Sequence, residues 1–416
     1  MSKQIPQTLK GFRDFLPAEK QARDFVEHRI VEIFQQFGFE PLETPTLEYA
    51  SLLTGKYGDE ADKLVYTFED KGGRKVGLRY DQTVPSARVL AQYQHQLPKF
   101  FRRYQLQNVF RADKPQKGRY REFRQCDIDV FGSTNPVADA EILACAYFAY
   151  KNVGFSQVKL NINHRKQLIE TLTPFCDGTK LRVLSAITSI DKFDKVGSDG
   201  VVAELVSKGM EKNTAEKMLT TLQESSPTPD LQLILDSIET LGVSKEAIVF
   251  NPLIARGLDY YTGMIFEVTI PGFEVGSVGG GGRYDNLIED LSGISMPAVG
   301  MAFGFDRTVE AAEQLGLISN QQQNQNKVLV TLFDKSTQTQ TLQVAAKLRS
   351  AKITCEMYPE YDKLSKQFKL ADQKNIAWVV LVGEQEAADG TVTLKNMKTG
   401  KQQTMSVEAL LEKLKR

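Results

Sequence analysis

The chain has 416 residues and carries 52 lysines and arginines against 52 aspartates and glutamates, so its formal net charge is zero. This balance gives no reason, by itself, to expect a nucleic-acid-binding protein, although opposed segments can cancel in a whole-chain sum. A hydrophobic content of 41% with 25% charged residues excludes a disordered or collagen-like chain. The length exceeds what one hydrophobic core usually supports, so two or three domains are expected.

The cysteines and the first twenty residues bear on the compartment. Cys126, Cys145, Cys176 and Cys355 are scattered without a Cys-x-x-Cys pair. That pattern disfavours both a disulfide framework and a cysteine zinc site. Residues 1–20 mix charged residues with no long apolar run, so neither a signal peptide nor a membrane anchor is expected. We therefore expect a cytoplasmic protein without membrane contact.

Apolar spacing and turn residues predict regular elements over most of the first 160 residues. The expected elements are a helix at 17–37 capped by Gly38, a β-hairpin of 64–69 with 75–80, two longer strands at 99–110 and 122–131, and an alanine-rich helix at 136–151. The hairpin is indicated by the Lys-Gly-Gly-Arg turn between its two alternating segments.

The pattern changes to helices with Lys/Glu-rich faces between about residues 163 and 245. Helical segments are expected at Gly200–Ser207, Asn213–Leu222 and Leu231–Leu241, and we interpret the whole region as a helical insertion. Strand signals resume at Ile265–Ile270, and a last helix of this part is expected near 304–315.

The polar, low-complexity run 319–326 predicts a linker. Beyond it, short strands alternate with helices, which is typical of a small α/β domain. The expected elements are strands at 328–333, 353–358 and 378–382, helices at 337–350 and 364–374, a closing hairpin within 391–403, and an amphipathic helix at 406–414.

The densest chemical signal is basic. Residues 99–124 contain nine lysines and arginines against two acids. Residues an even number apart share one face of a strand, so Arg111 can oppose Arg119, Gln125 and Asp129 across the hairpin. Two converging arginines suit the oxygens of a phosphate. A solvated basic loop is the alternative interpretation.

Three further segments combine glycines with arginines or aromatic residues. Arg256–Gly263 permits close backbone approach to a ligand, or forms only a turn before the next strand. Gly279–Asp285 offers the same choice between close approach and a flexible turn. Pro297–Arg307 leads into a helix with an arginine in its first turn, which can bind phosphate or pack against a sheet. A Gly-x-Gly-x-x-Gly between a strand and a helix is missing, so a dinucleotide site is not expected.

Together these segments resemble the histidyl-tRNA synthetases, a family of class II aminoacyl-tRNA synthetases, over nearly the whole chain. The matching segments are Lys10–Pro17 for the N-terminal signature, Pro45 for the proline of motif 1, 111–129 for motif 2, 297–307 for motif 3, and 256–261 and 281–285 for the two segments peculiar to histidyl enzymes.

The resemblance implies an α+β architecture. An antiparallel-sheet catalytic domain of the class II type would cover residues 1–162 and 246–318, with a helical insertion domain at 163–245. The linker 319–326 would lead to an α/β anticodon-binding domain at 327–416. This last part contains 15 lysines and arginines against 10 acids, so the neutral chain is a sum of unlike parts.

The implied reaction has two steps. The carboxylate of L-histidine attacks ATP, with Mg²⁺ on the phosphates, to give histidyl-adenylate and pyrophosphate; the 3′-hydroxyl of tRNA(His) then takes the histidyl group. No side chain is an obvious general base, so positioning and electrostatics would supply the rate. The family also implies a homodimer through motif 1 around Pro45.

The resemblance implies roles for the arginines. Arg111 would hold the α-phosphate of ATP, and Arg119 with Arg307 would clamp the outer phosphates. Arg256 would contact the histidine carboxylate and the α-phosphate, so Arg256 and Arg111 would be the catalytic residues. Fixed guanidinium donors suit charge that moves among phosphate oxygens during transfer.

The resemblance also implies a histidine pocket and a contact with the tRNA acceptor end. Asp81, Thr83 and Gln125 would hold the α-ammonium, Asp129 and Tyr261 would read the imidazole with Tyr260 beside them, Tyr284 would line the pocket, and Lys114, Gln116 and Lys117 would reach the acceptor end. An imidazole needs partners for both ring nitrogens, which a carboxylate and a hydroxyl supply. Asp81 and Asp129 depart from the many bacterial members that carry glutamate there.

Other interpretations are a non-catalytic relative, either a regulatory subunit of ATP phosphoribosyltransferase or a tRNA-sensing domain fused to a kinase. The regulatory subunit lacks an anticodon domain and typically loses adenylation residues, whereas this chain keeps Arg111, Arg256 and Arg307. Within the last domain, Trp378 lies in an apolar run and is expected in the core rather than on an anticodon base.

Overall fold

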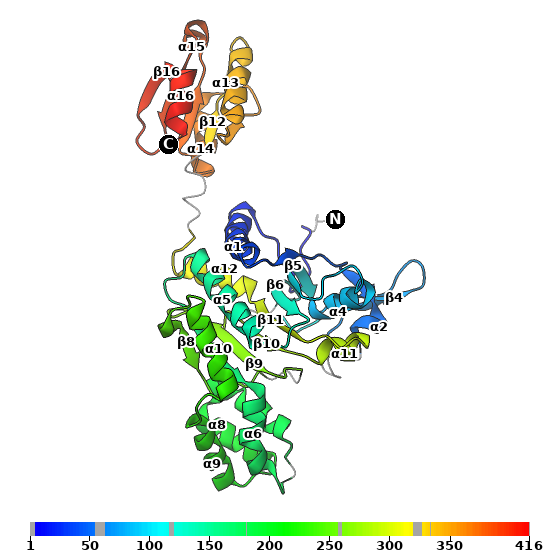
Figure 1. Ribbon diagram of the computed structural model, residues 1–416. Helices are drawn as coiled ribbons and strands as arrows, with labels where there is room; N and C mark the ends of the chain where they lie inside the picture. Colours follow the sequence, from blue (N-terminus) through cyan, green and yellow to red (C-terminus); the bar gives the residue numbers. More distant parts are fainter. Residues whose placement is uncertain are drawn as a thin grey trace. The chain divides into compact units, whose positions relative to one another are not determined.

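The computed structural model describes residues 5–54, 63–115, 120–179, 181–256, 260–318, 327–332 and 334–415. The chain forms two compact units, residues 1–317 and residues 318–416 (Figure 1). The expected linker at 319–326 lies outside the described residues. Among those that are described, no helix combines the length and the apolar character needed to span a bilayer.

The first unit is built on a sheet of eight strands in the order β1-β5-β6-β11-β10-β9-β7-β8. The strands are β1 Glu40–Pro41, β5 Phe101–Phe110, β6 Glu122–Phe131, β7 Lys159–His164, β8 Ile248–Phe250, β9 Met264–Thr269, β10 Gly279–Arg283 and β11 Ala298–Phe303. The interior pairs are all antiparallel, and only the edge pairs β1–β5 and β7–β8 are parallel. The expected antiparallel sheet of an α+β fold is therefore confirmed.

Three helices pack on one face of this sheet: α1 Pro17–Gln36, α5 Pro136–Val153 and α12 Phe305–Gln314. Phe303 of β11 shows which face they cover, because its ring lies 5.3 Å from that of Phe34 in α1 and 5.0 Å from that of Tyr150 in α5. Side chains alternate along a strand, so the neighbouring residues of β11 point to the opposite face.

A small sheet of β2 Leu47–Tyr49, β4 Lys75–Leu78 and β3 Thr67–Glu69 lies beside the large one, in the order β2-β4-β3. Strands β3 and β4 are the expected hairpin. Three short helices were not anticipated from the sequence: α2 Ala50–Leu53, α4 Thr83–Gln92 and α11 Leu287–Ser292.

Between β7 and β8 the chain leaves the sheet and forms five helices, α6 Arg165–Cys176, α7 Val183–Ile190, α8 Phe193–Ser207, α9 Lys212–Gln223 and α10 Pro229–Thr240. Two of the helical segments expected here fall within α8 and α9, and the third ends one residue beyond α10, so the three helices are confirmed. Figure 1 shows α6, α8 and α9 gathered at one end of the first unit, while α10 packs against α5.

The second unit holds a five-stranded sheet in the order β13-β12-β14-β15-β16. Its elements are β12 Val328–Val330, α13 Gln338–Ser350, β13 Cys355–Met357, α14 Leu364–Gln373, β14 Trp378–Leu381, α15 Glu384–Asp389, β15 Thr391–Asn396, β16 Gln402–Ser406 and α16 Val407–Leu414. Trp378 is partly buried against the apolar core, as its sequence context predicts.

Candidate active site

The floor of the candidate site is the face of the large sheet that points away from α1 and α5. On this face Asp129 of β6 stands beside Gly300 of β11, which in turn pairs with Gly282 of β10. The next row runs from Asp127 through Ala302 to Gly280 and ends on Glu267 of β9. Small residues in the middle strands therefore leave a flat floor between polar side chains on either side.

The glycine run 279–282 is a strand in the centre of the sheet and not a turn. Glycine is required because side chains of the site lie directly over it. A Cβ on Gly280 would lie 2.8 Å from Nη1 of Arg256, and one on Gly282 would lie 2.9 Å from Cδ1 of Tyr261. A Cβ on Gly300 would lie 1.8 Å from Oδ1 of Asp129. The glycine backbone is thus closely approached, as the sequence allowed, by side chains of the protein itself.

A cavity of about 450 Å³ opens above this floor and brings three expected residues together. Arg111, Arg256 and Arg307 all line it, although they come from distant parts of the chain. Arg111 is held by a hydrogen bond from Nε to the carbonyl of Tyr80 at 3.2 Å, and Arg307 donates to the carbonyl of Ser277 at 2.8 Å. Arg124 lines the cavity as well, and four guanidinium groups around one cavity attract anions.

Arg256 links this cavity to the aromatic side of the site. Its Nη1 pairs with Oε1 of Glu267 at 2.9 Å, and its guanidinium lies 5.9 Å from the ring centre of Tyr261. Burial by itself would lower the pKa of Arg256, but Tyr261 and Glu267 raise it above the usual value. The side chain therefore stays cationic. Arg256 also has a φ of +47°, which is rare for a residue with a Cβ and typical of functional sites.

A pocket of buried polar residues surrounds Asp129. Its carboxylate accepts a hydrogen bond from the hydroxyl of Tyr284 and forms an ion pair with Nη2 of Arg103 at 2.6 Å. Burial raises the pKa of Asp129, and Arg103 and Tyr284 oppose that rise. The rings of Tyr260 and Tyr261 lie 4.6 Å apart, and that of Tyr284 lies edge-on to Tyr260 at 6.0 Å.

Arg103 was missed as a functional residue. The sequence counts it only as one of nine cations, yet it is 1% exposed and pairs with Asp129. The register of the β5–β6 hairpin places Arg103 directly opposite Asp129. Counting back from Arg111 in steps of two would have put Arg103 on the site face, so the signal was present.

Asp81 and Thr83 lie where α4 begins. Oδ1 of Asp81 accepts from the backbone N–H of Val84 at 3.1 Å, which satisfies a free donor of the first helical turn. Between the two residues, Gln82 donates to the carbonyls of Gln107 and Gln125, each at 3.1 Å. The start of α4 is therefore tied to β5 and β6 beside Gln125.

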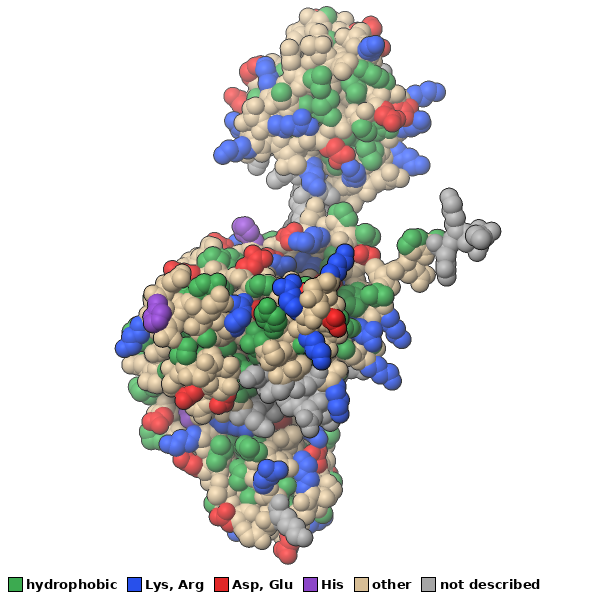
Figure 2. All heavy atoms as spheres, turned by 90° about the vertical axis from the view of Figure 1, so that its right-hand side faces the viewer, with side chains coloured by type: hydrophobic (Ala, Val, Ile, Leu, Met, Phe, Trp, Pro, Cys, Tyr) green, Lys and Arg blue, Asp and Glu red, His purple; other side chains and the backbone are tan. Residues whose placement is uncertain are grey.

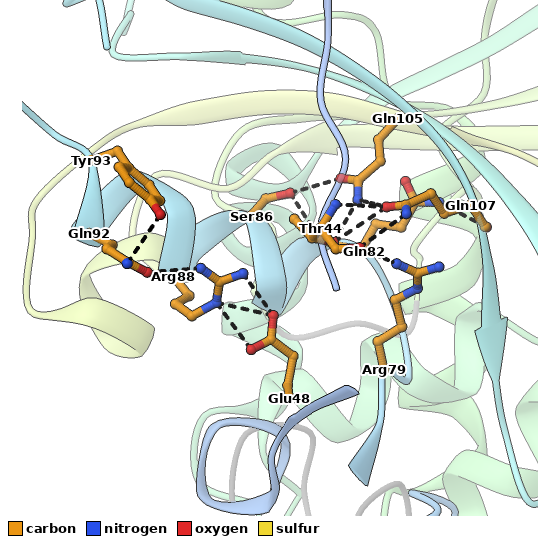
Figure 3. Close-up of polar contacts among 10 residues, drawn as sticks. All are labelled: Thr44, Glu48, Arg79, Gln82, Ser86, Arg88, Gln92, Tyr93, Gln105 and Gln107. Atoms are coloured by element: carbon orange, nitrogen blue, oxygen red, sulfur yellow. Dashed lines mark hydrogen bonds and ion pairs between the residues drawn. The ribbon is translucent and has the colours of Figure 1, made fainter. Parts of the chain in front are cut away.

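The segment around Pro45 is anchored to the same strands by a polar network (Figure 3). Gln105 donates to Oγ1 of Thr44 at 2.8 Å, and Gln107 accepts from the backbone N–H of Thr44 at 3.0 Å. Arg79 donates to the carbonyl of Thr44 at 2.8 Å. Pro45 itself is exposed. The network fixes the residue before Pro45 and leaves Pro45 on the surface.

The N-terminal segment that contains Gly11 and Arg13 contacts both the segment 111–129 and the segment 297–307. The guanidinium of Arg13 lies 3.3 Å from the ring centre of Tyr120, and its Nη2 pairs with Oδ1 of Asp306 at 2.9 Å. Tyr120 and Asp306 both line the cavity. A Cβ on Gly11 would lie 2.9 Å from Cγ of Arg121, so the signature runs closely along motif 2.

Some expected residues cannot be placed. Arg119, Gln116 and Lys117 lie outside the described residues, as do residues 257–259. Lys114 is described and exposed. His28 and His95 are exposed, and His164 is the last residue of β7. Within the described ranges, no group of three or more His, Cys, Asp or Glu side chains is arranged to hold a metal ion.

A mainly antiparallel sheet with an arginine-lined cavity on its open face, followed by a separate α/β unit, defines a class II aminoacyl-tRNA synthetase. A family model described as histidyl-tRNA synthetase matches residues 11–308, and one described as anticodon binding domain matches residues 326–416. The chain belongs to the histidyl-tRNA synthetase family.

Similar proteins agree with this assignment. The chain is 38% identical to the histidine–tRNA ligase of Wolinella succinogenes, over 98% of this chain and 97% of that one. It is also 38% identical to the histidine–tRNA ligase of Rhodopirellula baltica, over 98% of each. The crystal structure of histidyl-tRNA synthetase from Nostoc sp. PCC 7120 superimposes with a TM-score of 0.87 at 28% identity and covers 100% of both chains.

One further solved structure shares the fold at lower sequence identity. A structure from Bacillus halodurans, titled as an ATP phosphoribosyltransferase regulatory subunit/histidyl-tRNA synthetase, superimposes with a TM-score of 0.72 over 87% of this chain at 22% identity. At that identity the likeness shows a common fold, and the family assignment of this chain rests on the two family models that match it.

Proposed function

We propose that this chain is a histidine–tRNA ligase that uses the described cavity for ATP and the pocket around Asp129 for L-histidine. The observation that carries the proposal is the position of Arg256, which lines the arginine-rich cavity and also lies beside Tyr261. A histidine whose carboxylate lies between Tyr261 and the arginine-rich cavity would bring that carboxylate to the α-phosphate of a nucleotide bound in the cavity. Histidyl-adenylate and pyrophosphate are the products of that encounter, and tRNA(His) then receives the histidyl group.

ATP would bind through the arginines of the cavity. Arg111 approaches from the end of β5 and takes the α-phosphate, while Arg307, in the first turn of α12, takes the outer phosphates with Arg119. The hydrogen bonds of Arg111 and Arg307 to backbone carbonyls hold both side chains in place before ATP arrives. Donors that need no reorganisation are the main source of rate enhancement in phosphoryl-group chemistry.

Histidine would lie along β6 from Gln125 to Asp129. Its α-ammonium would meet Gln125, Asp81 and Thr83, and its imidazole would meet Asp129 and Tyr261, with Tyr260 and Tyr284 closing the aromatic side. Asp129 is buried, so a side chain without a matching N–H would leave the carboxylate unpaired. A site of this kind can discriminate by about 10⁴ or more.

Mg²⁺ would accompany ATP. Mg²⁺ in such sites is held mainly by phosphate oxygens and by one or two carboxylates. The cavity offers a carboxylate at Glu267, which fits this requirement while it also pairs with Arg256. The ion would supply neutralisation of the pyrophosphate charge.

The tRNA would contact both units. The acceptor end would meet Lys114, Gln116 and Lys117, and the anticodon would meet residues 327–416. On the face drawn in Figure 2, Lys and Arg side chains are spread over the second unit. Its 15 lysines and arginines against 10 acids give it a net attraction for phosphates although the chain is neutral.

A homodimer through motif 1 is the proposed assembly, and the cytoplasm is the proposed location. The segment that follows the fixed Thr44 exposes apolar side chains: Leu47 is 46% exposed and Tyr49 is 60% exposed. Neighbouring apolar groups that are left in water are typical of a protein interface.

The decisive experiment is histidine-dependent exchange of pyrophosphate into ATP. We expect Arg256→Ala to abolish this exchange. A matched control is Arg102→Ala, since Arg102 is on β5 but pairs with Glu141 on the other face of the sheet. No exchange with histidine by the unmodified protein, or equal exchange with other amino acids, would overturn the proposal.

A second experiment concerns residues 327–416. We expect their deletion to leave pyrophosphate exchange intact and to weaken charging of tRNA(His), because the adenylation residues all lie in the first unit. Unchanged charging by the shortened chain would refute the anticodon role.

A further inference from the structure

Asp127 is a buried acid of the site that none of the roles above uses. It lies on β6 between Gln125 and Asp129, and alternation along the strand puts all three side chains on the same face. It is only 4% exposed. Its neighbours Gln125 along the strand and Ala302 across it both line the cavity, so Asp127 adjoins the cavity wall.

The two aspartates differ in their partners. Asp129 is engaged by Arg103 and by the hydroxyl of Tyr284. Oδ2 of Asp129 lacks a hydrogen bond of its own but lies 2.6 Å from Nη2 of Arg103, whereas Oδ1 of Asp127 is enclosed by protein and has no hydrogen-bond partner among the described residues. Buried polar atoms are nearly always bonded, so an exception needs an explanation, and contact with a bound ligand is one.

The charges around Asp127 do not balance. Asp129 on its own strand and Asp81 before α4 are like charges, Arg103 on β5 and Arg111 are the opposing cations, and the Arg256–Glu267 pair lies beyond β11. Burial raises the pKa of Asp127 to about 8, against the pull of Arg103 and with the help of Asp129 and Asp81. A pKa of about 8 favours the protonated form of this carboxyl at neutral pH, although Arg103 and Arg111 oppose the effect of burial.

We infer that Asp127 is a further substrate-binding residue, which accepts an N–H of the α-ammonium of histidine through its carboxylate. The inference rests on the proposed function and adds a residue to the ammonium site of Asp81, Thr83 and Gln125. Small residues opposite Asp127, Ala302 and then Gly280, leave the space above the floor for the substrate backbone.

A proton is exchanged in this step. The carboxyl of Asp127 releases its proton to the solvent, and the resulting carboxylate accepts the N–H of the ammonium group, which keeps its own charge. Histidine and the proton thus compete for Asp127. Affinity for histidine falls as the pH drops below about 8, by up to about tenfold per pH unit. The fall ends at the lower pH at which Asp127 also takes up a proton in the complex with histidine.

The test compares Asp127→Asn with the unmodified protein. The amide keeps the shape and removes the charged acceptor, so histidine should bind about 10- to 100-fold more weakly, the usual effect of losing a charge-assisted hydrogen bond. Competitive inhibition by 3-(imidazol-4-yl)propionate, which has no α-amino group, should not change. Equal weakening for both molecules would overturn the assignment to the ammonium group.

Proton release is the second readout. Titration calorimetry with histidine at pH 7 in two buffers of different ionisation enthalpy should show up to one more proton released by the unmodified protein than by Asp127→Asn. Glu122→Gln is the matched control, because Glu122 lies on the opposite face of β6 and bonds Asn108 at 2.8 Å. Its affinity and proton count should match those of the unmodified protein.

The outcomes are separable. If the unmodified protein shows no histidine-dependent exchange, the proposed function fails. If exchange is normal but Asp127→Asn binds histidine with unchanged affinity and unchanged proton release, only the role of Asp127 fails.

Discussion

Replacing Gly300 by alanine tests the geometry of the histidine pocket. A Cβ at this position would lie 1.8 Å from Oδ1 and 2.5 Å from Cγ of Asp129. Real Cβ atoms essentially never come closer than 3.0 Å to a neighbour. The carboxylate of Asp129 must therefore retreat by at least the difference between 3.0 and 1.8 Å, or 1.2 Å.

This retreat should remove Asp129 from its present partners. Its ion pair with Arg103 is 2.6 Å long and its other oxygen bonds Tyr284, so neither contact survives a shift of that size unchanged. A misplacement of about 1 Å in an active site can cost on the order of 10²-fold in rate. We expect kcat/KM for histidine in pyrophosphate exchange to fall by about that factor in Gly300→Ala.

Two comparisons separate this effect from a general loss of structure. The Cβ would also approach the carbonyl of Ile128 at 2.6 Å, so some loss of stability is expected. Val299→Ala removes a buried side chain of the same strand that points to the other face, and should lower stability without raising KM for histidine. Retention of normal kcat/KM by a folded Gly300→Ala protein would refute the reasoning.

Three further predictions concern other parts of the molecule. Arg13→Ala should raise KM for ATP more than KM for histidine, because Arg13 contacts Tyr120 and Asp306 at the cavity. Arg13→Lys, which can keep the ion pair with Asp306, should recover part of the loss. An equal rise in the two KM values would contradict this prediction. Asp139→Ala should lower the free energy of unfolding by about 3 kcal/mol, since it removes the buried carboxylate that pairs with Arg283 and leaves only the more exposed Asp285 as its ionic partner. A loss under about 1 kcal/mol in urea unfolding would contradict it. Affinity for tRNA(His) should fall steeply between about 50 and 200 mM salt, and a flat salt dependence in filter binding would rule out phosphate contacts as its main source.

Much of the fold was accessible from local patterns. The long helices α1 and α5 and the strands β5 and β6 follow from apolar spacing and turn residues, which act within a few residues of one another. Strand β10 was not accessible in this way. Four glycines carry no β propensity, and they form a strand only because β9 and β11 supply hydrogen bonds on both sides.

For the candidate site, too, local sequence predicts some features and tertiary structure decides the others. Its residue types and their spacing within each motif identify the family, because arginines, aromatic residues and glycines at those positions suit phosphate and imidazole chemistry. The sequence could not indicate that Arg256 lies over Gly280, nor that Arg103 engages Asp129 while Asp127 keeps an unpartnered oxygen. Those facts depend on the register of strands that are far apart in the chain.

By itself, the sequence determined the family, the reaction that the family implies and most of the helices and strands, since each depends on short motifs or local periodicity. Only the tertiary structure decided which side chains meet. Folding brings Arg111, Arg256 and Arg307 around one cavity, and burial raises the pKa of Asp127 and of Asp129. Desolvation and contact arise only in the folded chain, so the pKa shifts that they cause cannot be read from the residue types.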